Sequence, residues 1–292
     1  MQTVHQLDPL RRAVEALRVD GPLALVPTMG ALHDGHLTLV REARRVARHV
    51  AVSIFVNPRQ FGAGEDLDAY PRQLARDVDM LAGEGVSLVW APTVKVMYPD
   101  GYATNVSVSG VSEGLDGAAR PGHFDGVATV VVKLFNQVRP DVAFFGEKDW
   151  QQLAVIRRMA RDLDLVRPHV DTIYGIATVR EADGLAMSSR NAYLTPEERA
   201  KAAALPQAMR EAIDALAAGE DAAPTLAELR HKLLAGGFAS VDYADLRDPD
   251  TLAPVAKLES AGARLLVAAR IGKARLIDNM PVPGRVQGSV SI

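Results

Sequence analysis

Four short apolar runs that alternate with amphipathic stretches constrain the fold of this chain most strongly. The runs lie at residues 23–26, 49–55, 86–90 and 142–145. Continuous apolar runs of this length are typical of strands buried on both faces, and strands that alternate with helices form right-handed βαβ units. The sequence therefore predicts an α/β fold with a Rossmann-like parallel sheet and flanking helices.

The pattern changes near residue 180, where we place a domain boundary. Thr195-Pro-Glu-Glu198 then has the residues of a helix N-terminus, with Thr as N-cap and Glu three residues later. This helix is expected to run toward Ala218, with a kink or restart at Pro206. Further elements are expected at 226–234 (a helix) and at 240–246, 264–270 and 274–278 (strands). They predict a smaller α+β C-terminal domain over 181–292 with a short antiparallel sheet, whose tail after Pro283 is frayed.

Residues 92–122 form the least regular part of the sequence, with one plausible strand at 104–108. Two more strands are expected at 170–173 and 176–179. Long irregular regions inside compact domains are either functional or disordered. We favour function here, because the region ends in the polar and glycine-rich stretch Arg120-Pro-Gly-His-Phe-Asp-Gly126.

Bulk properties exclude several classes of protein. The 292 residues include no cysteine, which removes disulfides, thiolate metal sites and a cysteine nucleophile. A formal charge of −3 gives no general bias toward nucleic acid. The N-terminus lacks a basic segment followed by an apolar core, and no apolar run approaches the roughly 20 residues of a membrane span. We therefore expect a cytoplasmic protein with no membrane or nucleic-acid partner.

Polar side chains follow the predicted strands at the points where the strands end. His33 and His36 flank Gly35 after the first strand, Gln60 follows the second, and Lys148 follows the fourth. Open parallel sheets bind ligands at the carboxyl ends of their strands, and a helix start there offers unpaired N–H groups to an anion. We therefore expect one binding site at this edge of the sheet.

Three interpretations of His33 and His36 are open from the residues alone. The pair can cap or pack at a helix start. A zinc site needs a third ligand, and no familiar spacing supplies one. In the third interpretation the imidazoles donate hydrogen bonds to a triphosphate, and Gly35 lets the backbone come close. Nucleotidyl transfer needs such charge stabilisation and alignment more than a covalent nucleophile.

Lys148 and the segment 188–190 are ambiguous in the same way, since both resemble ordinary turns. If Lys148 lies at the same edge of the sheet as the histidines, we expect its ammonium to bind phosphate. Asp149 is expected to cap the next helix or to hold a ribose or Mg²⁺. The two serine hydroxyls and the guanidinium of 188–190 suit β- and γ-phosphates. They follow Gly184 in a loop that could close over a site.

Gln60 and Gln152 are neutral groups that follow strand ends. Taken alone, each is more often a surface residue. An amide can, however, donate to a carboxylate and accept from a hydroxyl without reacting, which fits the binding of a small hydroxy acid.

Together these stretches resemble a known family. Residues 27–36 (PTMGALHDGH) are similar to the HxGH signature of the nucleotidyltransferases related to class I aminoacyl-tRNA synthetases, and 187–190 (MSSR) to their second signature. More narrowly, the chain resembles the pantothenate synthetase (pantoate–β-alanine ligase) family. The further segments that fit it are VNPRQF at 56–61, RPGHF at 120–124, FGEKDWQQ at 145–152 and READGLAMSSRN at 180–191.

The resemblance implies a reaction and its partners. The family joins (R)-pantoate to β-alanine with ATP and Mg²⁺, through a pantoyl adenylate, and releases AMP and diphosphate. Members of the family are typically homodimers, so the resemblance implies a homodimer here. It also implies an ATP- and pantoate-binding domain over 1–180 and a C-terminal lid domain over 181–292, which keeps the acyl adenylate from water.

The resemblance also implies site residues. The ATP site would comprise Met29, Gly30, Ala31, Leu32, His33, Asp34, Gly35, His36, Gly146, Glu147, Lys148, Asp149, Val179, Met187, Ser188, Ser189 and Arg190. Of these, His33, His36, Lys148, Ser188, Ser189 and Arg190 would act in catalysis, with His36 as the proton donor. Gln60 and Gln152 would bind pantoate, and Gln60 also β-alanine. Lesser candidates near the acyl site are Tyr70 and Arg120. The Mg²⁺ ligands stay open, with Asp77 as one possibility.

Two rival functions remain. Another nucleotidyltransferase of the superfamily would need a basic acceptor pocket where this chain has Gln60 and Gln152. A non-catalytic nucleotide-binding module would not need the complete set of His33, His36, Lys148 and 188–190.

Overall fold

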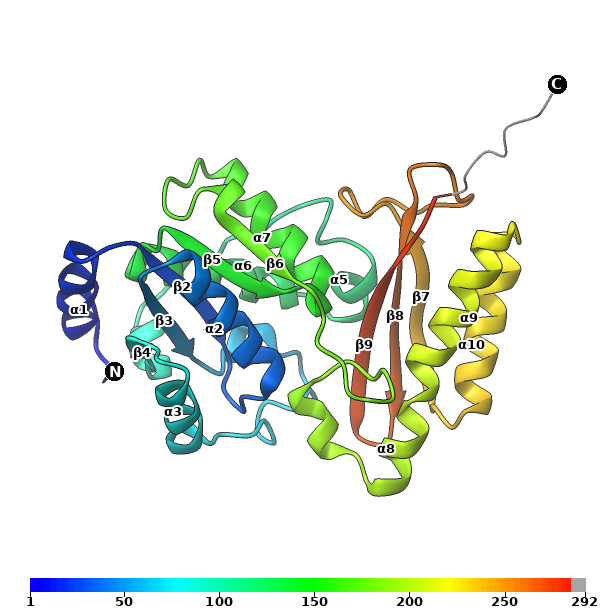
Figure 1. The fold of residues 1–292 in the computed structure, drawn as a ribbon, viewed down its shortest axis with the longest axis horizontal. Helices are drawn as coiled ribbons and strands as arrows, with labels where there is room; N and C mark the ends of the chain where they lie inside the picture. Colours follow the sequence, from blue (N-terminus) through cyan, green and yellow to red (C-terminus); the bar gives the residue numbers. More distant parts are fainter. Residues whose placement is uncertain (285–292) are drawn as a thin grey trace. The chain divides into compact units, whose positions relative to one another are not determined.

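The computed structural model describes residues 1–284 of the chain and divides it into two compact units, Met1–Val179 and Arg180–Ile292. Figure 1 shows their elements. The expected fraying of the tail after Pro283 concerns mainly residues outside the described part. None of the helices in the described part is long and apolar enough to cross a membrane.

The first unit contains a six-stranded sheet in which all neighbouring strands are parallel. Its strands are β1 (Gln2–Val4), β2 (Leu23–Thr28), β3 (His49–Ile54), β4 (Leu88–Trp90), β5 (Val142–Gly146) and β6 (Ile173–Ile176). Their order is β1-β4-β3-β2-β5-β6. From β2 the chain therefore adds β3 and β4 on one side, whereas β5 and β6 lie on the other side. This reversal between β2 and β5 creates the kind of crevice where α/β sheets bind ligands.

Helices cover both faces of this sheet. They are α1 (Leu7–Val19), α2 (Asp34–Val46), α3 (Leu74–Gly83), α4 (Val94–Met97), α5 (Leu115–Ala119), α6 (His123–Val138) and α7 (Trp150–Asp162), with 3₁₀ turns η1 (Pro58–Gln60), η2 (Glu147–Asp149) and η3 (Val170–Thr172). Leu23 and Leu25 join the core formed with α1, α6 and α7, whereas Ala24 and Val26 join the core formed with α2 and α3. Because alternate residues of a strand point to opposite faces, a run without polar residues fills both cores.

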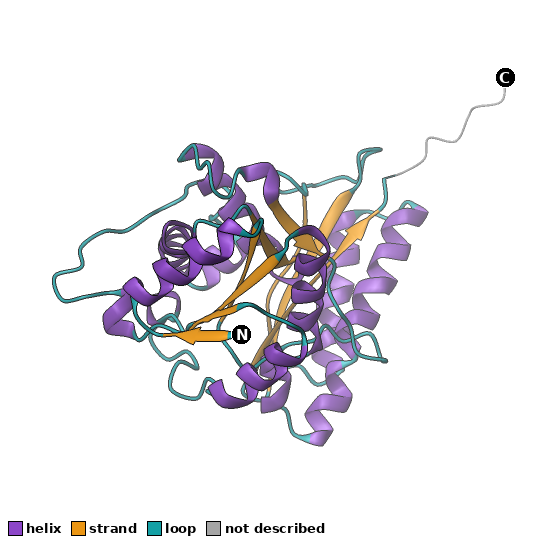
Figure 2. Ribbon diagram, turned by 60° about the vertical axis from the view of Figure 1, so that its left-hand side comes forward, coloured by secondary structure: helices purple, strands orange, loops and turns teal. Residues whose placement is uncertain are grey.

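The second unit contains a three-stranded antiparallel sheet of β7 (Ser240–Arg247), β8 (Ala263–Ile271) and β9 (Ala274–Val282). Its helices are α8 (Pro196–Ala202), α9 (Ala204–Ala218) and α10 (Ala222–Ala235), and a 3₁₀ turn, η4, spans Ser189–Tyr193. α9 and α10 lie side by side and share one apolar core with the sheet (Figure 1). In Figure 2 the strands of both units are orange and the helices purple. The predicted fold class is confirmed.

The helix start at Thr195 is confirmed in detail. The Glu198 N–H donates to the Thr195 hydroxyl at 3.2 Å, and the Thr195 N–H donates to the Glu198 carboxylate at 2.9 Å. The expected restart near Pro206 also occurs, because α8 ends at Ala202 and α9 begins at Ala204. Pro206 thus stands in the first turn of α9, where its missing N–H costs no helix hydrogen bond.

Several predicted strands were wrong. Residues 104–108 form no strand, and the Val106 N–H donates instead to the Thr129 hydroxyl at 2.9 Å. The two strands expected over 170–179 are one, β6, preceded by the 3₁₀ turn η3. The three-residue β1 was missed, because so short a segment carries no readable alternation.

Pro27 does not end the first predicted strand but lies inside β2. The pairing of β2 with β3 continues to Thr28, and the Phe55 N–H donates to the Thr28 carbonyl. Successive residues point their backbone groups to opposite neighbours, so Pro27 faces the β5 side. There the pairing stops at Leu25, and a missing N–H costs nothing.

Candidate active site

The loop between β2 and α2 ends at His33, and His36 follows in the first turn of α2. We call this segment the histidine loop, and a buried carboxylate holds it. Asp77 of α3 is 1% exposed and accepts the N–H groups of Ala31 and Leu32, one on each oxygen, both at 2.9 Å. Gly30 has φ +85°, and a Cβ there would lie 3.0 Å from the Asp77 carboxylate. The loop therefore requires glycine at this point and an acceptor in α3.

This geometry corrects the suggestion that Asp77 is a Mg²⁺ ligand. Both of its carboxylate oxygens already accept backbone hydrogen bonds, and the side chain is buried. Asp77 instead has a structural role: from its place in α3 it holds the backbone of the histidine loop. In residues 1–284, no group of three histidine, aspartate or glutamate residues is placed to hold a metal ion.

His33 and His36 lie against each other at the start of α2, with ring centroids 4.1 Å apart. The His33 N–H donates to Nδ1 of His36 at 3.3 Å. Because Nδ1 accepts, the ring hydrogen of neutral His36 is assigned to Nε2. Burial, the neighbouring His33 and the charge of Lys148 together lower the pKa of His36 to about 3. At neutral pH this side chain is therefore an uncharged N–H donor.

Lys148 lies in η2, directly after β5, the strand that neighbours β2. Its ammonium acts electrostatically on His36, which brings these two predicted residues to one place. Its side chain is only 18% exposed and its Nζ lies 4.0 Å from the Asp149 carboxylate. The predicted capping role of Asp149 was wrong, since its side chain makes no capping hydrogen bond to α7.

Gln60 lies at the end of the neighbouring strand β3, in η1, and is 8% exposed. Its Nε2 donates to the Met29 sulfur at 3.0 Å, so it contacts the histidine loop directly. Its Oε1 accepts from Asn57 at 3.1 Å. The carboxyl ends of β2, β3 and β5 therefore form one polar edge, as the sequence predicts.

The backbone carbonyl of Gln60 is held by a second group of side chains. It accepts from Nδ1 of His123 at 2.8 Å and from Arg120 at 3.2 Å. Arg120 also forms a bidentate ion pair with Glu65, with distances of 2.7 and 2.6 Å. Burial and the Arg120 charge lower the pKa of His123 to about 4, and the Arg120 guanidinium lowers the pKa of Glu65 to about 2.

The two adjacent glutamines of α7 have different surroundings. Gln151 is 4% exposed; it accepts from the Asp116 N–H at 3.0 Å and donates to the Val111 carbonyl at 3.1 Å. Gln152 is half-buried, and within the described residues its side chain forms no hydrogen bond to protein. Its amide is thus available to a ligand.

The predicted phosphate residues 187–190 belong to the second unit. The Ser188 hydroxyl accepts from the Arg190 N–H at 3.2 Å, which forms an ordinary turn. Asn191 ties this turn to the Glu181 carboxylate at 2.9 Å, and Arg180 is fixed by the fully buried Asp278 at 2.7 and 2.9 Å. Val179, the last residue of the first unit, directly precedes this ion pair.

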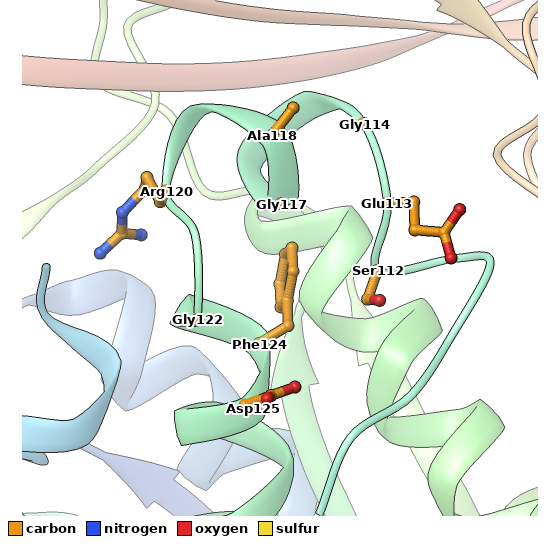
Figure 3. Close-up of a pocket in the computed structure, with 9 residues that line it drawn as sticks. All are labelled: Ser112, Glu113, Gly114, Gly117, Ala118, Arg120, Gly122, Phe124 and Asp125. Atoms are coloured by element: carbon orange, nitrogen blue, oxygen red, sulfur yellow. The ribbon is translucent and has the colours of Figure 1, made fainter.

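A cavity of about 320 Å³ lies beside the start of α6 (Figure 3). It is lined by Ser112, Glu113, Gly114, Gly117, Ala118, Arg120, Gly122, Phe124 and Asp125. Apart from Arg120, whose guanidinium is paired with Glu65, its lining includes none of the predicted site residues. This cavity is therefore lined mainly by residues other than those predicted for the site.

Comparison with known proteins decides the family. A family model described as pantoate-beta-alanine ligase matches residues 2–281. The chain belongs to the pantoate–β-alanine ligase family. It is therefore an enzyme of a family that forms an amide bond. A pantothenate synthetase from Novosphingobium aromaticivorans is 70% identical over 97% of this chain and 99% of its own. A pantothenate synthetase from Sphingopyxis alaskensis is 61% identical over 97% of this chain and 100% of its own.

Solved structures of pantoate–β-alanine ligases match the fold. Pantothenate synthetase from Thermus thermophilus gives a TM-score of 0.89 at 48% identity, covering 97% of this chain and 100% of its own. The Francisella tularensis ligase, solved with beta-gamma ATP and beta-alanine, gives 0.82 at 33% identity, covering 96% and 97%.

Sequence reasoning missed four residues around the predicted site, namely Asn57, Tyr98, His123 and Gln151, and it gave Asp77 a different role. Asn57 and His123 stand inside quoted motifs, which was the available signal. Asp77 and Tyr98 carry no such signal, because the residues that they bind lie 46 and 41 positions away in the sequence.

Proposed function

We propose that the chain catalyses the ATP-dependent condensation of (R)-pantoate with β-alanine to give pantothenate, AMP and diphosphate. A pantoate carboxylate oxygen attacks the α-phosphorus of ATP, and diphosphate leaves with its bonding electrons. The β-alanine amine then attacks the acyl carbon of the pantoyl adenylate, loses a proton and displaces AMP. The observation that carries the proposal is the single polar edge formed by His36, Lys148 and Gln60.

His36 and Lys148 would stabilise the phosphates. A neutral His36 carries its ring hydrogen on Nε2 and can donate it in a hydrogen bond to a phosphate oxygen. Lys148 adds a positive charge at the same place. Preorganised donors and charges of this kind favour a transition state in which negative charge moves onto the leaving diphosphate. The loop from Met29 to Gly35, fixed by Asp77, would supply backbone contacts to ATP.

Gln60 and Gln152 would hold pantoate, whose hydroxyl and carboxylate groups match an amide. Gln60 is fixed by Asn57, and the Gln152 amide is available. An uncharged pair suits the carboxylate, because a charged partner would stabilise the nucleophile before it reacts. Gln60 would also contact β-alanine in the second step.

The second unit would complete the ATP site. Val179 would contact adenine, and Met187, Ser188, Ser189 and Arg190 would bind phosphates when the unit closes over the intermediate. Mg²⁺ would be held largely by ATP phosphates and water, as is usual for nucleotide-bound Mg²⁺. That coordination suits a chain whose described residues contain no ready acidic cluster.

ATP–diphosphate exchange tests the proposal. Exchange should require pantoate and not β-alanine, and AMP should appear only when β-alanine is added. A transferase acting on a phosphate-bearing acceptor would show no pantoate-dependent exchange, and a nucleotide-binding module would show no exchange with any acid. Either result would overturn the proposal.

The expected homodimer and cytoplasmic location remain predictions. Light scattering on the purified protein should give about twice the mass of 31.3 kDa for one chain. Fractionation of cells should recover the protein with the cytosol. A monomeric mass, or recovery with membranes, would contradict the respective prediction.

A further inference from the structure

The side chain of Gln60 is held in one orientation by Asn57. Asn57 is 1% exposed, and its Nδ2 donates to Oε1 of Gln60 at 3.1 Å and to the Gly126 carbonyl at 3.0 Å. With its oxygen engaged, the Gln60 amide turns its Nε2 toward Met29. The second hydrogen on Nε2 is then the group that Gln60 can offer to a substrate oxygen.

The orientation of Asn57 is in turn fixed by two donors. Its Oδ1 accepts from the Arg59 N–H at 3.2 Å and from the Tyr98 hydroxyl at 2.8 Å. If the amide of Asn57 were reversed, both donors would face an NH₂ group. The hydroxyl of Tyr98 makes the shorter of these contacts and comes from a distant part of the chain.

The surroundings of Tyr98 keep its hydroxyl a hydrogen-bond donor. The ring directly follows α4 and packs against Phe55 and Tyr102, with centroids 6.1 and 5.1 Å away. The cationic groups of Arg59 and Lys133 lie 5.4 and 6.0 Å from its centroid. Burial raises the pKa of the Tyr98 phenol above its usual range, so the proton stays on the oxygen.

We infer that Tyr98 is a positioning residue for pantoate: its hydroxyl, acting through Asn57, determines that Gln60 presents an N–H donor rather than a carbonyl oxygen to the substrate. Tyr98 itself contacts neither substrate nor ATP in this scheme. The inference rests on the proposed role of Gln60 in binding pantoate. It adds that the recognised group is an oxygen acceptor of the acid.

Tyr98→Phe tests the inference, since it removes the hydroxyl and retains the ring. The matched control is Tyr102→Phe, because the Tyr102 ring packs edge-to-face against Tyr98 and lies near the same two cations, Arg59 and Lys133. In pantoate-dependent ATP–diphosphate exchange, Tyr98→Phe should raise the KM for pantoate about tenfold, the effect of losing one well-placed hydrogen bond. The KM for ATP should stay within about twofold, and Tyr102→Phe should change neither.

A double-mutant cycle with Gln60→Ala separates this inference from the proposed function. If Gln60→Ala raises the pantoate KM, and Tyr98→Phe adds nothing in that background, the relay is supported. If Tyr98→Phe leaves the pantoate KM unchanged, or raises it equally with and without Gln60, the relay is overturned while the role of Gln60 stands. If Gln60→Ala itself leaves the pantoate KM unchanged, the proposed pantoate site falls, and the relay with it.

Thermal unfolding of each variant supplies the remaining control. All kinetics are compared at a temperature at which every variant is folded. A general loosening by Tyr98→Phe would raise the KM values of ATP and pantoate together. That outcome contradicts a positioning role.

Discussion

At the scale of single residues, the proposed site depends on side chains to which no substrate contact is assigned. Asp77 shows this best, since its carboxylate replaces the missing partners of two N–H groups just before a helix begins. An amide there would turn an NH₂ group toward one of these donors. A buried donor left without an acceptor costs about 1–3 kcal/mol.

Asp77→Asn should therefore disturb the histidine loop. We expect the KM for ATP to rise about tenfold and the unfolding midpoint to fall by several degrees. Asp79→Asn, two positions along α3 and exposed, is the control and should change neither quantity. An Asp77→Asn enzyme with the wild-type affinity for ATP would show that the loop does not need this acceptor.

Lys148 is expected to act more directly. Lys148→Ala should lower the rate of adenylate formation about 10²-fold or more, because one preorganised charge on the phosphates is lost. The same change should raise the pKa of His36, since the Lys148 charge helps to lower it. Single-turnover formation of pantoyl adenylate measures the rate, with exposed Lys95→Ala as control. Near-normal adenylate formation would reject the role.

At the scale of elements, neighbouring glutamines of α7 separate packing from binding. Gln151 connects α7 to the irregular segment 111–116 through contacts to Val111, Glu113, Gly114 and Asp116. The side chain of Gln152 is half-buried and, within the described residues, forms no such contacts. The helix therefore uses Gln151 for packing, whereas Gln152 is the glutamine that we propose for binding pantoate.

Paired substitutions should show this division. Gln151→Leu should reduce the free energy of unfolding by about 1–3 kcal/mol, because buried backbone groups lose their partner. Gln152→Leu should leave the stability nearly unchanged and raise the KM for pantoate more than that for ATP. Urea unfolding and exchange kinetics on both variants measure these effects. The reverse assignment of the two effects would show that the wrong glutamine was placed in the site.

The helices and strands were largely predictable from the sequence. The side chains that hold the site residues in place were not. The local apolar run predicts a buried strand such as β2 or β3, and the four residues from Thr195 predict a helix start. The two glutamines at 151 and 152 look alike in sequence, since burial is decided by the segment that packs on them. Asp77 and Tyr98 act on residues far along the chain, and no local pattern encodes such a contact. The strand β1 was missed because three residues carry no readable alternation, and the strand predicted at 104–108 was wrong because Val106 binds the Thr129 side chain instead.

At the scale of the whole molecule, half-buried His36 and buried His123 link stability to pH. The pKa values of His36 and His123 are about 3 and about 4, below the usual value of 6.5. Between pH 6.5 and 4 the unfolded chain therefore binds more protons than the folded chain. Stability is fully present above pH 6.5 and falls as pH decreases, by at most about 1.4 kcal/mol per pH unit for each histidine.

Urea unfolding of the first unit at pH 7.5, 6.0 and 5.0 should show this loss. His123→Gln should make the dependence shallower, because one of the two proton-binding groups is removed. These values of pH lie above the window, from the usual pKa of 4.5 down to about 2, in which Glu65 would contribute. A stability that does not change between pH 7.5 and 5.0 would contradict histidines that stay neutral in the folded chain.

The position of β2 beside β5 has a consequence for how the enzyme acquires its activity during synthesis. Leu25 pairs with Ala143, so the histidine loop and Lys148 meet only after the chain between them has been made and folded. Closing so long a loop is slow compared with local folding. We therefore expect a nascent chain to form its histidine loop before the proposed nucleotide site is complete. Because the proposed ATP site needs both parts of the sheet, ATP would stabilise only molecules that have completed this step.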